Sequence, residues 1–485
     1  MRTGNEVAVG LETVKGFTGI SSDSRDIQPG YLFAAIPGTK SDGAQFLPDA
    51  VARGAAAVLG RPELADMVKE AGLRFIPAEN PRLALAKAAA AYYGIQPQII
   101  AAITGTNGKT SITVFLREIW THLGKRAASM GTIGVITPDR EIKLNNTTPG
   151  PVEVQKLLAE VKADGIDHLA LEASSHGLDQ YRLDGARIAV AGFTNLTRDH
   201  LDYHASFEAY LQAKLRLFHE VVDDNAPAVI NADAEYADRF IAASRERGLK
   251  LITVGEHGGG LKLLSRKPTA EGQTLEVLYA GTTYTVTLPL AGGFQASNAL
   301  VAAGMAIGLG EDPAAVFEAL QHIKGAPGRL EKVALAASGA PVFVDYAHTP
   351  DALETVLNAL RPHAERKLSV VFGCGGDRDK GKRPLMGAIA ARLADRAIVT
   401  DDNPRSEDPA QIRAAILAAS PGATEIADRA EAIHKGISEL SQGDVLVIAG
   451  KGHESGQIVG SAIHPFSDRE EAIKAAIALG GREYL

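Results

Sequence analysis

The stretch Ile99–Ser111 (IIAAITGTNGKTS) constrains the fold most, because an apolar run ends abruptly in a loop with two glycines, a lysine and two hydroxyls. The apolar run is typical of a buried parallel strand, and apolar residues at helical spacing follow the loop. The loop therefore lies at a helix N-terminus, where unpaired N–H groups and the helix dipole attract an anion. We interpret it as a phosphate loop, with Lys109 on the β- and γ-phosphates of a nucleotide and Thr110 on Mg²⁺. The alternative is an ordinary turn with a solvated lysine.

The composition bounds the class of protein. Its 485 residues predict about three domains, and no apolar run approaches the length of a membrane span. The N-terminus lacks the features of a secretory signal, and the single cysteine, Cys374, excludes an internal disulfide and fits a reducing compartment. We therefore expect a cytoplasmic protein. The net charge of −8 argues against a general nucleic-acid surface but allows local basic pockets for anionic ligands.

The order of the expected elements predicts an α/β protein with three domains. Residues 1–97 alternate short strands and Ala-rich helices, as a small α/β domain does. Residues 98–328 alternate strand and helix around the phosphate loop, which predicts a mostly parallel sheet with helices on both faces. Residues 329–485 contain repeated βα units, which predict a Rossmann-like domain.

A carboxylate follows the apolar strand expected at 168–171. Glu172 comes at its carboxyl end, where parallel sheets place ligand-binding residues, and a carboxylate there suits Mg²⁺ opposite the hydroxyl of Thr110. The alternative is a structural ion pair between Glu172 and a lysine. A polar cluster follows, too polar for a core: Ser174, Ser175, His176, Gly177, Gln180 and Arg182.

A second cluster of histidines and carboxylates lies between a strand and a helix: Asp199, His200, Asp202 and His204. No cysteine or HExxH motif supports zinc here, so an oxygen-rich Mg²⁺ site with one imidazole fits better. The helix that follows carries Lys214 in a largely apolar neighbourhood. Burial would lower its pKa, and a neutral amine can capture CO₂ as a carbamate; the alternative is a lysine that extends to the surface.

Polar residues end each strand of the last domain, which predicts one ligand-binding edge: Asp345, His348, Arg378, Asn403, Arg405, Lys451 and Glu454. Arginine offers a planar fork for a carboxylate, so Arg378 and Arg405 favour carboxylate recognition over solvated loop charges. Asn146, Thr147 and Thr148 precede another helix, and Asn298 opens one; capping is the local alternative for these four.

The ordered motifs TGTNGKT, NTTPG, ExSSHG, RDHLDYH, DYAHTPD, GCGGDRDKGKRP, DNPR and GKGHE resemble the Mur ligase family across the whole chain. Within it they resemble the ligases that add meso-2,6-diaminopimelate to the D-glutamate of UDP-N-acetylmuramoyl-L-alanyl-D-glutamate in peptidoglycan synthesis. The resemblance implies a uridine-binding domain at 1–97, an ATP-binding domain at 98–328 and an amino-acid-binding domain at 329–485. It implies ATP as substrate, Mg²⁺ as cofactor and an acyl-phosphate intermediate. We expect a monomer.

The resemblance also assigns residues. For ATP it implies Gly105, Thr106, Asn107, Gly108, Lys109, Thr110, Ser111, Asn298, Arg329, Asp345 and His348. For the UDP-precursor it implies Ser22, Ser24, Thr39, Lys40, Ser41, Asn146, Thr147, Thr148, Ser174, Gln180 and Arg182. For diaminopimelate it implies Arg378, Asp402, Asn403, Pro404, Arg405, Gly450 and Glu454. The implied catalytic residues are Lys109, Lys214, His200 and Glu172, and the implied metal site is Thr110, Glu172, His200 and carbamylated Lys214.

Three other functions remain open at this point. The alternatives are an L-lysine-adding ligase of the same family, a folylpolyglutamate synthase and a nucleotide-dependent binding module. SSHG and DNPR speak against the synthase, and Arg405 speaks against lysine, whose distal carbon carries no carboxylate. The function of a binding module would not require Glu172, His200 and Lys214 to lie close together. ATP hydrolysis measured with candidate amino acids separates these functions.

Overall fold

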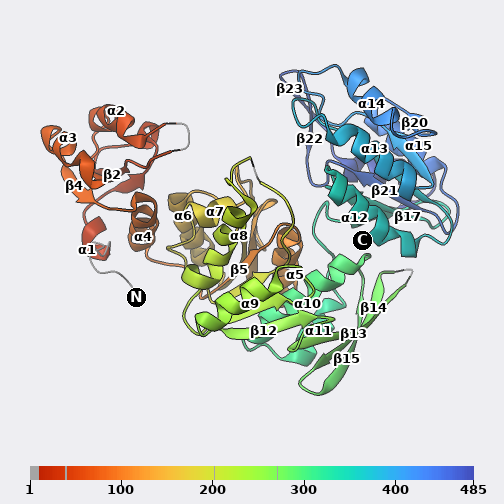
Figure 1. The fold of residues 1–485 in the computed structure, drawn as a ribbon, viewed down its shortest axis with the longest axis horizontal. Helices are drawn as coiled ribbons and strands as arrows, with labels where there is room; N and C mark the ends of the chain where they lie inside the picture. The colour runs from red at the N-terminus through yellow and green to blue at the C-terminus, as the bar shows by residue number, and fades with distance from the viewer. Residues whose placement is uncertain (1–9, 39–40, 201, 270, 485) are drawn as a thin grey trace. The chain divides into compact units, whose positions relative to one another are not determined.

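The computed structural model describes residues 10–38, 41–200, 202–269 and 271–484. The chain divides into two compact units, Met1–Lys262 with Leu300–Ala319, and Leu263–Ala299 with Leu320–Leu485. Three elements, β13 (Leu261–Pro268), α10 (Gly293–Gly308) and α11 (Pro313–Leu320), contribute residues to both units. Figure 1 shows the helices and strands of each unit.

The first unit begins with a small parallel sheet in the order β1-β2-β3-β4. Its strands are Gly19–Ser21, Tyr31–Ala34, Ala57–Gly60 and Arg74–Pro77. Its helices are α1 (Leu11–Val14), α2 (Leu47–Ala52), α3 (Ala65–Glu70) and α4 (Pro81–Tyr93). One apolar cluster lies on each face of this sheet, because successive side chains of a strand point to opposite faces. Leu32 of β2 packs in one cluster and Phe33 in the other. This confirms the α/β alternation expected for the N-terminal region.

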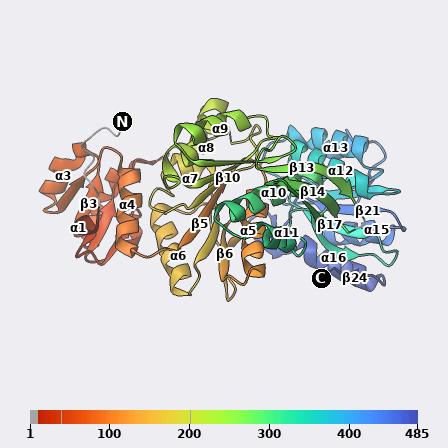
Figure 2. The ribbon, with the colours of Figure 1, turned by 90° about the horizontal axis from the view of Figure 1, so that it is seen from below.

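Gln96 fixes the segment between α4 and the next strand. Its side-chain amide donates to Gln155 Oε1 and to the Gly185 carbonyl, both at 2.8 Å, and its Oε1 accepts from Arg187 N at 3.0 Å. Helix α4 lies beside α6 (Pro151–Ala163) (Figure 1 and Figure 2). The segment is therefore hydrogen-bonded into the first unit.

A larger sheet forms the rest of the first unit, with parallel strands in the order β12-β11-β10-β5-β9-β6 and antiparallel β7 and β8 at the edge. The strands are β5 (Ile99–Thr104), β6 (Ala127–Gly131), β7 (Gly134–Ile136), β8 (Glu141–Ile142), β9 (His168–Glu172), β10 (Val190–Phe193), β11 (Pro227–Asn231) and β12 (Lys250–Gly255). The helices are α5 (Lys109–His122), α6, α7 (Ser175–Asp179), α8 (Phe207–Arg216), which continues as a π-helix (Leu217–Val221), α9 (Ala237–Glu246) and α11 (Pro313–Leu320).

The position of β5 determines where chemistry can occur. Strand β5 lies between β9 and β10, and all three run parallel. Their carboxyl ends therefore share one edge of the sheet, which is where open α/β sheets bind ligands. The phosphate loop follows β5, Glu172 ends β9, and Thr194 follows β10.

The second unit contains a seven-stranded sheet in the order β20-β19-β18-β21-β17-β16-β24 and the hairpin β14–β15. The strands are β14 (Gln273–Tyr279), β15 (Thr282–Leu288), β16 (Glu331–Leu335), β17 (Pro341–Asp345), β18 (Leu368–Phe372), β19 (Arg396–Val399), β20 (Thr424–Glu425), β21 (Val445–Ala449), β22 (Gly456–Val459), β23 (Ala462–Pro465) and β24 (Arg482–Glu483). The helices are α12 (Pro350–Leu360), α13 (Lys382–Leu393), α14 (Pro409–Leu417), α15 (Arg429–Ser438) and α16 (Asp468–Ala478).

Strands β17, β21, β18 and β19 are parallel, and apolar clusters cover both faces of their sheet. This confirms the βα units expected from the sequence. Cys374 is buried and free, and burial raises its pKa to about 11. Among the described residues, no helix combines the length and the apolar character that a membrane crossing needs.

Candidate functional site

The loop after β5 is a compact anion cradle. Gly105 has φ of +151° and Gly108 of +86°, backbone conformations that side chains disfavour. A Cβ on Gly105 would lie 1.9 Å from Thr194 Oγ1, so glycine is also required by the close approach of the loop that follows β10. Asn107 N donates to Asn195 Oδ1 at 2.9 Å, and Thr106 Oγ1 lies 3.0 Å from the Tyr210 hydroxyl. The loop is thus held in shape by its neighbours.

Two lysines meet at one carbonyl of this loop. Lys109 Nζ donates to Gly105 O at 2.9 Å and to Thr106 O at 2.8 Å, and Lys214 Nζ donates to Gly105 O at 2.7 Å. Lys214 is 1% exposed, which rules out the alternative of a lysine that extends to the surface. Burial lowers the pKa of Lys214 well below its ordinary value, and the neighbouring Lys109 cation lowers it further. A low pKa supplies the neutral amine that carbamate formation requires.

Glu172 lies opposite the start of α5. Its Oε1 accepts from Thr110 Oγ1 at 2.9 Å and from Thr132 N at 2.8 Å, and it is 2% exposed. Its hydrogen-bond donors among the described residues are hydroxyl and amide groups. A Cβ on Gly131 would lie 2.2 Å from Glu172 Oε1, so a glycine at the end of β6 makes room for this carboxylate.

His200 belongs to a group of rings beside the loop. Its ring centroid lies 5.0 Å from that of His176 and 6.0 Å from that of Tyr210. Burial lowers the pKa of His200; Asp199 opposes this, while Lys109 and Lys214 add to it. A neutral imidazole can act as a metal ligand. His200 has φ of +53°, and its neighbour Leu201 lies outside the described residues.

The residues on this edge suit a hydrated Mg²⁺ ion that also binds substrate phosphates. Mg²⁺ takes few protein ligands. The Thr110 hydroxyl and the Glu172 carboxylate, whose oxygens lie 2.9 Å apart, each provide an oxygen ligand. Within the described residues, no three His, Cys, Asp or Glu side chains form a closed metal cage. The expected metal site therefore depends on His200 and on a carboxylate made from Lys214.

A pocket of about 220 Å³ lies between the small sheet and the larger one in the first unit. It contains four of the residues predicted to bind the UDP-precursor, together with Arg82, which the sequence reasoning did not select: Ser22, Asn146, Gln180 and Arg182. Arg182 donates to the Thr148 carbonyl and to Gln180 Oε1, and burial lowers its pKa. Arg82 donates to the Pro37 carbonyl at 2.6 Å. Two guanidinium groups make this pocket basic, as an anionic ligand requires.

Other predicted precursor residues have structural partners. Thr148 Oγ1 donates to Glu172 O at 2.8 Å, and Thr147 Oγ1 lies 3.1 Å from Thr132 Oγ1. Helix α6 is capped by Gly150, so the capping alternative for residues 146–148 is wrong. Ser174 caps α7, and Ser24 is buried. The Ser41 carbonyl accepts from Gly38 N; Thr39 and Lys40 lie outside the described residues.

The second unit holds the four remaining residues predicted for ATP in one chain of contacts. Asn298 Nδ2 donates to Gln295 Oε1 at 3.2 Å, inside α10 rather than at its cap. Gln295 in turn donates to Arg329 O at 3.0 Å, and the Arg329 guanidinium lies 4.6 Å from the ring centroid of Tyr346. Asp345 ends β17, accepts from Leu330 N and Ala347 N, and has its pKa raised to about 6 by burial. Burial lowers the pKa of His348, whose Nδ1 lies 2.9 Å from Tyr346 O.

The residues predicted for diaminopimelate lie at the carboxyl ends of β18, β19 and β21. Asp402 and Asn403 are buried, and a Cβ on Gly450 would lie 2.6 Å from Asp402 Oδ2. Arg405 has φ of +53°, and its Nη1 donates to Gly376 O at 2.8 Å. Arg378 is exposed in the loop after β18. A Cβ on Gly376 would lie 1.9 Å from Pro404 O, so the absence of a side chain at Gly376 lets the loops after β18 and β19 approach each other closely.

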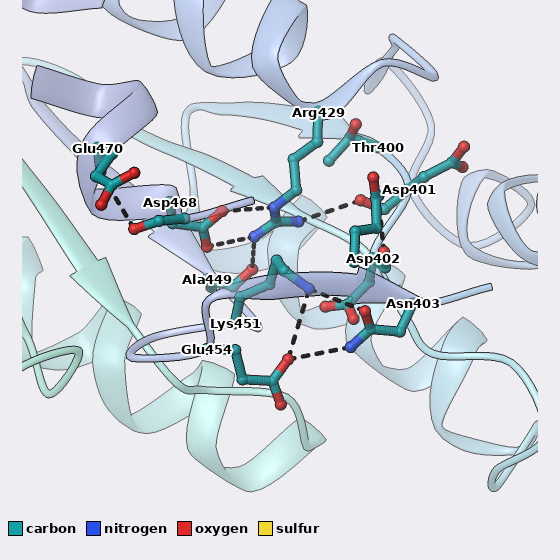
Figure 3. A network of polar contacts seen from close by, with 12 residues as sticks. Thr400, Asp401, Asp402, Asn403, Arg429, Ala449, Lys451, Glu454, Asp468 and Glu470 are labelled. Atoms are coloured by element: carbon teal, nitrogen blue, oxygen red, sulfur yellow. Dashed lines mark hydrogen bonds and ion pairs between the residues drawn. The ribbon is translucent and has the colours of Figure 1, made fainter. Parts of the chain in front are cut away.

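Two buried cations join these loops: Lys451, which the sequence places on the ligand-binding edge, and Arg429, for which the sequence predicts no role. Arg429 pairs with Asp468 at 2.7 Å and donates to Ala449 O at 3.0 Å, and Lys451 donates to Asn403 Oδ1 at 2.9 Å (Figure 3). Lys451 belongs to the predicted ligand-binding edge, but its burial could not be predicted from the sequence. Thr132 directly follows β6, and its place at the end of a parallel strand was the signal for it.

The chain is similar to known proteins along most of its length. Models of the Mur ligase family match three regions of the chain: the catalytic domain at 16–93, the middle domain at 103–306 and the glutamate ligase domain at 328–452. A UDP-N-acetylmuramoyl-L-alanyl-D-glutamate–2,6-diaminopimelate ligase of Caulobacter vibrioides is 55% identical over 463 residues, covering 94% of this chain and 95% of that protein. The protein of the same name in Brucella melitensis is 51% identical over 481 residues, covering 99% and 98%.

A solved structure is similar over the same length. It is a UDP-N-acetylmuramoyl-L-alanyl-D-glutamate–2,6-diaminopimelate ligase with a TM-score of 0.74 and 36% identity, covering 96% of this chain and 95% of that one. The three-domain α/β fold expected from the sequence is thus confirmed.

Proposed function

Because the chain belongs to the Mur ligase family, we propose that it is an ATP-dependent ligase that joins meso-2,6-diaminopimelate to the D-glutamate of UDP-N-acetylmuramoyl-L-alanyl-D-glutamate. Relatives at 51–55% identity bear that activity in their names. The reaction contributes the third amino acid of the peptidoglycan stem. We further propose that the enzyme acts as a monomer in the cytoplasm.

The observation that carries the proposal is the convergence of Lys109, Lys214 and Glu172 at one sheet edge. Glu172 reaches this centre through Thr110, and the two lysines share the Gly105 carbonyl. A carboxylate substrate and a polyphosphate repel each other, so a site that joins them must supply positive charge and hold both in line. This edge provides the Lys109 cation and the backbone N–H groups of the loop for that purpose.

The chemistry proceeds in two steps. An oxygen of the D-glutamate γ-carboxylate attacks the γ-phosphorus of ATP; a new P–O bond forms, and the bond to ADP breaks. The amine at the L-centre of diaminopimelate then attacks the acyl carbon. The tetrahedral intermediate expels phosphate, and the amine loses a proton to leave the amide. Lys109 stabilises the negative charge that develops on the transferred phosphoryl group.

We propose that Thr110, Glu172, His200 and carbamylated Lys214 hold Mg²⁺. When bound, the ion neutralises charge on the phosphates and the carboxylate. The neutral Lys214 amine would add to CO₂ and release one proton, which leaves an anionic carbamate that the Lys109 cation attracts. Arg182 and the pocket around it would hold the UDP-precursor, and Arg405 the distal carboxylate of diaminopimelate.

An isotope experiment tests the two-step chemistry. UDP-precursor labelled with ¹⁸O in the γ-carboxylate is incubated with ATP and diaminopimelate, and the released phosphate is analysed by mass spectrometry. We expect one ¹⁸O atom in each phosphate, because the carboxylate oxygen becomes the bridge of the acyl phosphate. Unlabelled phosphate together with amide product would contradict the acyl-phosphate mechanism.

A further inference from the structure

Three polar side chains form a closed triangle at the edge of the sheet in the second unit. Lys451 Nζ donates to Asn403 Oδ1 at 2.9 Å and to Glu454 Oε2 at 3.5 Å, and Asn403 Nδ2 donates to the same Glu454 oxygen at 3.1 Å (Figure 3). Asn403 follows β19, whereas Lys451 and Glu454 follow β21. The triangle therefore joins two loops of the predicted amino-acid site.

Lys451 and the Ile458 N–H together fix which way the Asn403 amide faces. Asn403 Oδ1 also accepts from Ile458 N at 2.9 Å, so both of its lone pairs are used by donors. With Oδ1 fixed toward Lys451, one Nδ2 hydrogen is used by Glu454 and the second is left for a ligand. In the same way, Glu454 Oε2 accepts hydrogen bonds within the triangle, and Oε1 is left to accept one from a ligand. An N–H donor beside a carboxylate oxygen suits the carboxylate and ammonium of one amino-acid end.

The triangle stands on a rigid base. Lys451 is 0% exposed, so its charge must be balanced by fixed partners. Next to it, Arg429 pairs through two nitrogens with Asp468 at the start of α16, and it also donates to Ala449 O and Asp401 O (Figure 3). Arg429 thereby ties the ends of β19 and β21 to α16. Lys451 thus lies between this base and the two ligand-facing residues.

We propose that Lys451 is a positioning residue for the amino-acid substrate, acting through Asn403 and Glu454 without touching the substrate itself. This inference rests on the proposed function. Removing the ammonium leaves Asn403 Oδ1 held by Ile458 N alone and leaves Glu454 without its cation, so the pair no longer presents a donor and an acceptor in a fixed arrangement. The loss falls on amino-acid binding, because ATP and the UDP-precursor depend on other residues.

Steady-state kinetics of Lys451→Met test the proposal. We expect the KM for diaminopimelate to rise at least about 10-fold, as is common when an outer-shell partner is removed, with kcat and the other two KM values changed less than about 3-fold. The control is Lys332→Met, which removes a mostly buried lysine of the same unit that contacts Glu271 and Tyr484. A Lys451→Met enzyme that behaves like this control would overturn the proposal.

A double-mutant cycle separates positioning from general structure. In an Asn403→Ala, Glu454→Gln background, Lys451→Met should raise the KM for diaminopimelate by less than about 3-fold more, because its targets are gone. A fully additive effect would overturn the proposal, as would loss of folded protein in both Lys451→Met and Lys451→Gln. A wild-type enzyme that forms no amide would instead contradict the proposed function.

Discussion

Lys214 is a buried lysine whose charge state determines what the phosphate-loop site can bind. A fully buried lysine that donates only to a carbonyl within its described contacts lacks the carboxylate partner that buried cations usually have. Burial and the nearby Lys109 both lower its pKa, so the amine is easily deprotonated. The proposed carbamylation would resolve this conflict by giving the buried group a negative charge and two oxygens beside the phosphate loop.

Lys214→Ala should be nearly inactive. The substitution removes the nitrogen that carries the carbamate, and we expect kcat to fall by roughly 10³-fold, the range seen when a charge-stabilising group is lost. Formate or acetate should restore part of the rate, because a small carboxylate can occupy the vacated space. The measurement is amide formation with and without added carboxylate, with Lys156→Ala, an exposed lysine of α6, as the control. Full activity without rescue would eliminate the carbamate.

Arg405→Ala should raise the KM for diaminopimelate by about 10- to 100-fold, since a hydrogen bond to a charged group contributes about 1.5–3 kcal/mol. Arg405→Lys should restore little, because an ammonium lacks the planar fork. The control is Arg392→Ala, which removes an exposed arginine paired with Glu354. Unchanged kinetics in Arg405→Ala would refute its role in selecting diaminopimelate over lysine.

At the scale of elements, function follows from the adjacency of β5, β9 and β10. The alternation of strand and helix predicts a parallel sheet, and the loop motif predicts the carboxyl end of β5 as the site. Glu172 could be predicted because it ends an apolar strand. The strand order could not be derived from periodicity, since parallel neighbours are separated by whole helices.

Buried polar contacts were hardest to predict from sequence. Arg429 begins a helix and Lys451 lies in a glycine-rich loop, positions that usually face solvent, yet both are buried because strands far apart in sequence meet there. Arg82 likewise lies in the first turn of α4 and faces a pocket formed with residues about 60 to 100 positions later. Local pattern carries no signal for such contacts.

Gly131→Ala tests the packing between β6 and Glu172. A Cβ there would lie 2.2 Å from Glu172 Oε1 and 2.5 Å from its Cγ, so the carboxylate must leave Thr110. We expect kcat to fall about 10²-fold or more because the metal and phosphate site is displaced. In the control, Gly259→Ala, the nearest atom is Thr253 Oγ1 at 3.5 Å, and activity should persist. Equal activity in the two variants would show that Glu172 tolerates displacement.

At the scale of the whole molecule, histidines couple stability to pH. Burial lowers the pKa of several of them, including His168, His176, His204 and His363, and lowers that of His453 to about 4. The unfolded chain therefore binds protons between about pH 6.5 and 4 that the folded protein does not. Stability must fall as the pH falls through this window, and the raised pKa of Asp345 opposes only part of it.

His453→Gln should reduce this acid sensitivity. From a folded pKa of about 4, His453 contributes a loss of up to about 2 kcal/mol between neutral pH and pH 5. The variant should therefore lose less Tm than the wild type between pH 7.5 and pH 5, measured by calorimetry. His464→Gln, at an exposed position of β23, is the control and should follow the wild type. Parallel Tm curves for His453→Gln and the wild type would show that His453 titrates normally in the fold.

The most direct measurement of the central claim is phosphate release by the purified enzyme in the presence of Mg²⁺ and ATP. We expect rapid release only when UDP-N-acetylmuramoyl-L-alanyl-D-glutamate and meso-diaminopimelate are both present, with one phosphate for each amide formed and little release when lysine replaces diaminopimelate. Phosphate release that is independent of either substrate, or equal with lysine, would contradict this claim.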